Sequence, residues 1–146
     1  LISRPPTGKI CLCLRAAPWF LDGLADGLKV SHPSLLPSAF ALLQACGRRV
    51  SQTTWIACPS CSRTTFDIEK ALRDVREATQ GMPGITIAVM GCVVNGPGEM
   101  QGADYGYVGA GKAKVNLYRK GEVVMKHIAE EEAVNKLVDL IRKDMA

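Results

Sequence analysis

The sequence predicts an α/β (α+β) sandwich in which a mixed sheet packs against helices. A short apolar run, residues 85–90, is bounded by glycines and is typical of a buried strand. Two segments, residues 67–80 and 130–143, carry apolar residues at helical spacing and polar residues elsewhere. Strand, helix, strand, hairpin and helix follow one another along the chain, an order that indicates helices layered on a sheet.

Composition limits the size of the fold and the class of partner. The 146 residues, 47% of them hydrophobic, suffice for one compact domain with a smaller additional piece. The formal net charge is +4, but lysine and arginine are scattered among acidic residues. The basic residues form no continuous stripe that could bind a phosphate backbone, so we expect no nucleic-acid partner.

No apolar run approaches the roughly 20 residues of a membrane span, and the start does not match a signal peptide, so we expect a cytoplasmic protein with no membrane partner.

The first 50 residues form the additional piece. Residues 10–14 alternate Cys11 and Cys13 with larger apolar residues, and we expect a buried strand in which both cysteines are small core residues. Two Asp-Gly steps between residues 21 and 27 indicate turns. Residues from 34 or 36 to 46 have helical spacing, with Gly47 as a C-terminal stop. We place a domain boundary near residue 50, which gives the two domains 1–50 and 51–146.

The second domain contains the remaining elements. Residues 53–57 favour a strand, and Asp67 is a good N-cap for the helix that follows. After the strand at residues 85–90, a short strand is expected at 104–109 and a closing helix at 130–143. The segments expected to form a hairpin are 114–118 and 122–126.

Cysteine placement points to a metal centre. A disulfide framework is disfavoured, because a core of this size needs no staples and cytosolic thiols stay reduced. Cys58 and Cys61 form a Cys-x-x-Cys pair after one expected strand, and Cys92 follows another. These thiolates are soft metal ligands, but three of them are one short of a closed tetrahedral site. Neither His32 nor His127 is near these loops in the sequence.

Glu99 is the best-placed fourth ligand. It follows Cys92 after a Gly-Pro-Gly turn that can fold back on itself, although such a glutamate also serves as an ordinary turn residue. An exchangeable carboxylate on one iron of a cluster would let that iron bind a substrate oxygen. Three alternatives stay open from the residues alone: a redox enzyme domain, a structural zinc-binding module and a simple iron-sulfur electron carrier.

One motif resembles a known enzyme family. Cys58-Pro-Ser-Cys61-Ser-Arg63, followed by Gly91-Cys-Val-Val-Asn-Gly-Pro-Gly-Glu99, resembles the C-terminal domain of 4-hydroxy-3-methylbut-2-enyl diphosphate synthase. That family acts in the methylerythritol phosphate route of isoprenoid biosynthesis. The likeness continues through Ala103-Asp-Tyr-Gly-Tyr-Val-Gly109 and, more weakly, reaches back to residues 21–27. The resemblance implies a fold similar to the iron-sulfur domains of sulfite and nitrite reductases.

The same resemblance implies a four-iron four-sulfur cluster bound by Cys58, Cys61, Cys92 and Glu99. It also implies that Glu99 and Asn95 are catalytic, with Asn95 positioning Glu99 or the substrate hydroxyl. The family's reaction is the reductive opening and dehydration of 2-C-methyl-D-erythritol 2,4-cyclodiphosphate. Ferredoxin or flavodoxin is the implied electron donor.

The family's diphosphate substrate is held by a TIM barrel, which needs about 250 residues. The chain is too short for one, so we expect residues 1–50 to be the last piece of the barrel side and the chain to be a fragment that is inactive alone. The resemblance further implies that the full-length enzyme is a homodimer.

Overall fold

The computed structural model describes residues 8–58, 62–64 and 66–145. They form two compact units, Leu1–Gln52 and Thr53–Ala146. In the described part of the chain, no helix has the length and apolar character needed to cross a bilayer.

The first unit is helical. It contains α1 (Lys9–Leu21), the short 3-10 helix η1 (Pro33–Leu35) and α2 (Leu36–Ala45). Phe20 of α1 is buried, and its carbonyl oxygen accepts a hydrogen bond of 2.8 Å from Nε of Arg48, beyond α2. This contact ties the two ends of the unit together. The predicted helix at residues 36–46 is confirmed by α2, after which Gly47 adopts a positive φ of 68°.

The strand expected at residues 10–14 is wrong, because these residues lie in α1. A short apolar run does not by itself distinguish a buried strand from a helix. Here the helix formers Ala16 and Ala17 continue the segment, and residues 8–52 contain no strand with which it could pair. Cys13 is exposed and Cys11 is half-buried, so the expectation that both are core residues is wrong for Cys13.

The second unit is a five-stranded mixed sheet with strand order β1-β2-β3-β4-β5. Strand β1 pairs parallel with β2 and β2 parallel with β3, whereas the last two pairings are antiparallel. The strands are β1 (Thr54–Ala57), β2 (Thr86–Met90), β3 (Tyr105–Gly109), β4 (Lys114–Arg119) and β5 (Glu122–Ala129). Helix α3 (Ile68–Thr79) connects β1 to β2, and α5 (Glu130–Met145) follows the hairpin. The predicted α/β class is therefore confirmed.

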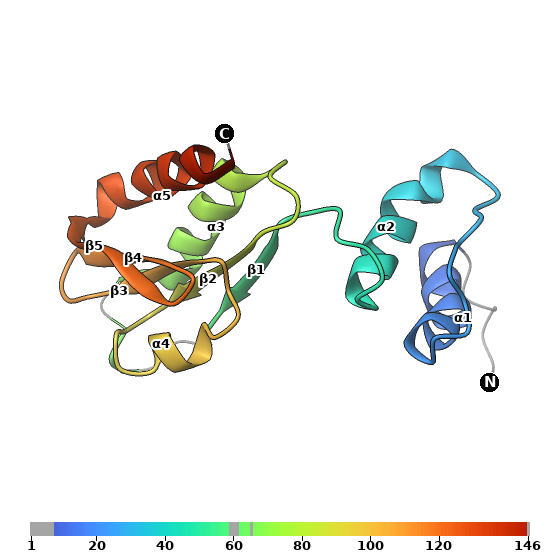
Figure 1. Ribbon diagram of the computed structural model, residues 1–146, viewed down its shortest axis with the longest axis horizontal. Coiled ribbons are helices and arrows are strands. Elements are labelled where there is room, and N and C mark those ends of the chain that lie inside the picture. Colours follow the sequence, from blue (N-terminus) through green and yellow to red (C-terminus); the bar gives the residue numbers. More distant parts are fainter. Residues whose placement is uncertain (1–7, 59–61, 65, 146) are drawn as a thin grey trace. The chain divides into compact units, whose positions relative to one another are not determined.

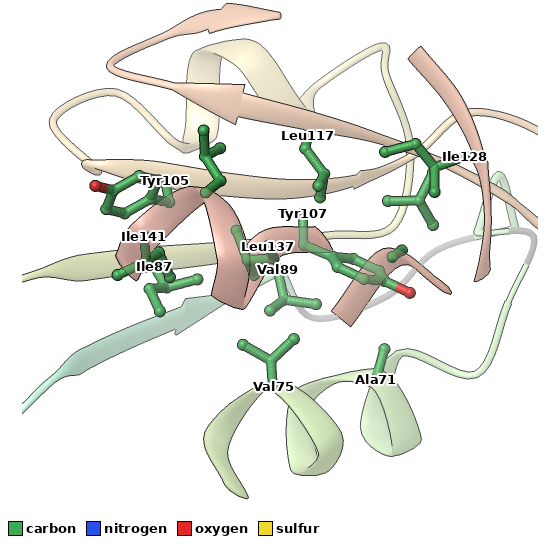
Figure 2. Packing of buried hydrophobic residues seen from close by; sticks show 13 residues of the cluster. Ala71, Val75, Ile87, Val89, Tyr105, Tyr107, Leu117, Ile128, Leu137 and Ile141 are labelled. Carbon is green, nitrogen blue, oxygen red and sulfur yellow. The ribbon is translucent and has the colours of Figure 1, made fainter. Parts of the chain in front are cut away.

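Two helices cover one face of the sheet, and the short helix α4 (Gly96–Glu99) lies on the other (Figure 1). Side chains alternate between the faces of a strand. Ile87 and Val89 of β2 therefore join the cluster beneath α3 and α5, while Ala88 and Met90 join a smaller cluster with Met100, beyond α4. In Figure 2, Val75 of α3 and Leu137 of α5 lie among the strand side chains. A strand covered on both faces is apolar throughout, which explains the unbroken run in β2.

Local capping agrees with the sequence. The carboxylate of Asp67 accepts a hydrogen bond of 2.9 Å from the backbone N–H of Lys70, as expected for the N-cap of α3.

Strand β3 is also linked to α5 by polar contacts. The Tyr105 hydroxyl donates to Asp144, which also pairs with Arg119 at 2.9 Å. Burial of the phenol and this hydrogen bond raise the pKa of Tyr105 to about 12.

The second unit should depend on Leu137 for its stability. Leu137 is 0% exposed, so Leu137→Ala should lower the free energy of unfolding by about 2–5 kcal/mol, because it removes buried methyl groups and leaves a cavity. Met145→Ala shortens a side chain that is 54% exposed on the same helix and should stay within about 0.5 kcal/mol of the wild type. Urea unfolding followed by circular dichroism measures both. Equal losses for the two variants would contradict this packing.

Candidate metal centre

The candidate site begins where two parallel strands end. Cys58 directly follows β1, and Cys92 lies two residues after β2. Residue Ala57 pairs with Val89, and the Cys58 backbone N–H donates to the Val89 carbonyl oxygen at 3.3 Å. Because the carboxyl ends of neighbouring parallel strands meet at one edge of a sheet, both cysteine loops begin at the same edge.

The Cys58 sulfur contacts the second loop directly. The backbone N–H of Gly91 donates to Cys58 Sγ at 3.2 Å, a hydrogen bond between residues 33 positions apart in the sequence. Cys58 is half-buried and packs against the apolar cluster that includes Met90. The thiol is therefore held within hydrogen-bond distance of the residue that precedes Cys92.

The segment after Cys92 forms α4, which packs closely on the sheet because two glycines carry no side chain. The Gly96 backbone N–H donates to the Cys92 carbonyl oxygen at 3.1 Å. A Cβ on Gly96 would lie 2.8 Å from Val108 Cγ1, and a Cβ on Gly106 would lie 2.8 Å from Met100 Cε. A side chain on Gly96 would push α4 away from Val108, and one on Gly106 would displace the end of the Met100 side chain, so both glycines serve close packing. The sequence indicated a turn at Gly-Pro-Gly; the structure instead forms one helical turn, with the proline in the first turn of the helix, where it is tolerated.

Asn95 and Glu99 lie at the two ends of α4. The Asn95 carbonyl oxygen accepts a hydrogen bond of 2.9 Å from the Glu99 backbone N–H. Both side chains are exposed, and neither forms a hydrogen bond or ion pair within the described residues. The carboxylate is thus open to a ligand, while the predicted catalytic roles of Asn95 and Glu99 stay predictions.

The donor groups within the described residues are two thiols and one carboxylate, which are ligand types that suit a soft metal or an iron-sulfur cluster. Cys58 and Cys92 are free thiols, and a single helical turn links the Cys92 segment to a carboxylate. Cys61, the third predicted thiolate, lies outside the described residues. Within the described ranges, no group of three or more His, Cys, Asp or Glu side chains lies close enough to hold a metal ion. Cys58 and Cys92 as metal ligands therefore stay predictions.

Comparison with known proteins identifies a family that matches the second unit. The family described as GcpE protein C-terminal domain matches residues 54–143, which include both strands and both cysteine loops. This chain belongs to that family. The match begins at the first residue of β1 and ends within α5, so it covers nearly all of the second unit.

Curated relatives carry the name of one enzyme. The chain is 50% identical over 127 residues to 4-hydroxy-3-methylbut-2-en-1-yl diphosphate synthase (flavodoxin) of Bacteroides fragilis, covering 83% of this chain and 20% of the relative. It is 43% identical over 141 residues to the ferredoxin form from Parasynechococcus marenigrum, covering 94% and 35%. A chloroplastic ferredoxin form from Arabidopsis thaliana is 44% identical over 128 residues, covering 84% and 17%. The chain thus spans about a sixth to a third of the length of these relatives.

Sequence reasoning named the cysteines but missed the role of the neighbouring backbone. It gave Gly91 no function, whereas its N–H is the group that touches Cys58 Sγ. The available signal was a glycine placed between a buried strand and a candidate ligand. Such a glycine marks a close approach of another chain segment.

Cobalt binding tests whether the two loops form one site. Co²⁺ bound to thiolates absorbs in proportion to the number of sulfur ligands, so Cys58→Ser and Cys92→Ser should each lower the charge-transfer absorption by roughly one third, given three thiolates. Cys46→Ser, which alters a half-buried thiol of the other unit, should leave the absorption unchanged. Full absorption in both Cys58→Ser and Cys92→Ser would contradict a shared site.

Proposed function

We propose that this chain is the cluster-bearing part of a 4-hydroxy-3-methylbut-2-enyl diphosphate synthase. The observation that carries the proposal is the contact between Cys58 Sγ and the Gly91 N–H, inside the region that matches the family. That contact joins the two cysteine loops from which the proposed ligands come. The names of the relatives support the reaction, and the coverage of 17–35% supports a partial enzyme.

The proposed ligands are the thiolates of Cys58, Cys61 and Cys92 and the carboxylate of Glu99. When bound, a four-iron four-sulfur cluster supplies electrons and a Lewis-acidic iron. The three thiolates are the lasting ligands, because soft sulfur binds iron strongly. Glu99 lies on an exposed turn of helix and would hold the remaining position as a harder, exchangeable oxygen ligand.

The chain contributes the reducing side of the reaction. The proposed substrate is 2-C-methyl-D-erythritol 2,4-cyclodiphosphate, whose ring opens as it takes up two electrons and two protons and releases one water. Its diphosphate would be held by a barrel domain that this chain is too short to contain. Residues 1–50 are proposed to be the last part of that side of the enzyme. The chain by itself should therefore show no turnover.

The proposed electron donor is a small redox protein. The relative from Bacteroides is named for flavodoxin and the one from Parasynechococcus for ferredoxin. The homodimer and the cytoplasmic location stay predictions, and the Arabidopsis relative is named as chloroplastic.

Metal analysis tests the proposal against its alternatives. After anaerobic reconstitution with iron and sulfide, the chain should be brown and hold about four iron and four sulfide per molecule, with no zinc. Cys92→Ser should lose most of this iron, because a lasting ligand is removed. A colourless wild-type chain with about one zinc per molecule, and no iron uptake, would refute the cluster and support a structural zinc module.

A further inference from the structure

A side chain on Gly91 would clash with a neighbouring residue. A Cβ built on Gly91 would lie 2.3 Å from Thr64 Oγ1, 3.0 Å from Thr64 Cγ2 and 3.1 Å from Thr64 Cβ. The φ of Gly91 is not positive, so no left-handed backbone conformation calls for glycine here. The three nearest atoms all belong to Thr64, so the requirement for glycine is steric.

A second glycine completes the close packing. Gly109 ends β3, beside β2, and a Cβ on it would lie 2.5 Å from the Gly91 carbonyl oxygen and 2.6 Å from Phe66 Cε1. Gly91, directly after β2, and Gly109, at the end of β3, thus present bare backbone to Thr64 and Phe66. These two residues can lie this close because neither glycine carries a side chain.

The same packing fixes a hydrogen bond to a proposed ligand. With Thr64 against its Cα, Gly91 directs its N–H to Cys58 Sγ at 3.2 Å. A methyl group on Gly91 must move either Thr64 or the Gly91 backbone. The donor N–H is part of the Gly91 backbone, so a movement of that backbone alters its geometry toward Cys58 Sγ directly.

We propose that Gly91 is a positioning residue whose missing side chain admits Thr64 and so keeps the Gly91 N–H on the Cys58 thiolate, raising the reduction potential of the cluster. This inference rests on the proposed function. An N–H donor stabilises negative charge on sulfur, and the reduced cluster carries one more negative charge than the oxidised one. The hydrogen bond therefore favours the reduced state, in line with the general dependence of cluster potentials on hydrogen bonds to sulfur.

The test compares Gly91→Ala, Thr64→Ala and the double variant in the anaerobically reconstituted chain. Redox titration followed by electron paramagnetic resonance measures the potential. Gly91→Ala should shift it to a more negative value, because the hydrogen bond is lengthened or lost. The double variant should return to the potential of Thr64→Ala, since that substitution removes Oγ1 and Cγ2, the two nearest atoms, and leaves Cβ at 3.1 Å.

Gly27→Ala is the matched control. A Cβ on Gly27 meets no atom within 4 Å, and its φ is not positive, so the potential should equal that of the wild type. If Gly91→Ala does not take up iron, iron uptake restored in the double variant supports the inference, and failure of both variants overturns it.

An unchanged potential in a loaded Gly91→Ala chain overturns the inference and leaves the proposed function intact. A double variant whose potential stays as negative as that of Gly91→Ala also overturns it, because the Thr64 contact is then not the cause. A wild-type chain that takes up no iron refutes the proposed function as well. The two failures are thus distinguishable.

Discussion

The candidate site depends on the parallel pairing of β1 and β2. These strands place Cys58 and the Gly91–Cys92 pair at one edge of the sheet, although 33 positions separate Cys58 from Gly91. The crossover through α3 makes this pairing possible, since parallel neighbours need a long connection. A slip of the register by one residue would turn Ile87 and Val89 away from the core beneath the helices. Core packing therefore also sets the geometry of the cysteine loops.

Small residues determine how closely the rest of the unit approaches this edge. Gly91 and Gly109 admit the segment containing Thr64 and Phe66, while Gly96 and Gly106 admit α4 and Met100. Gly106 lies in the interior of β3, where glycine ordinarily weakens a strand, so this position carries a cost offset by packing. Two sets of close contacts thus position the segments that carry the proposed ligands, one after β1 and the other after β2.

Most of the second unit could be predicted from the sequence because its signals are local. The amphipathic stripes of α3 and α5, the Asp67 cap and the apolar run of β2 each follow from residue type and spacing. The strand expected at residues 10–14 failed because its apolar run has no partner strand, and only tertiary context reveals that. For the same reason, the hydrogen bond from Gly91 to Cys58 could not be foreseen, since it depends on register and on a contact with Thr64.

The central claim is that this edge of the sheet holds a cluster with three thiolates and one exchangeable carboxylate. Mössbauer spectroscopy of the iron-enriched, anaerobically reconstituted chain tests it most directly. We predict one iron that differs from the other three, whose signal alone changes in Glu99→Ala and stays unchanged in Glu77→Ala, an exposed glutamate of α3. Four equivalent irons, or a Glu99→Ala spectrum identical to that of the wild type, would contradict the account.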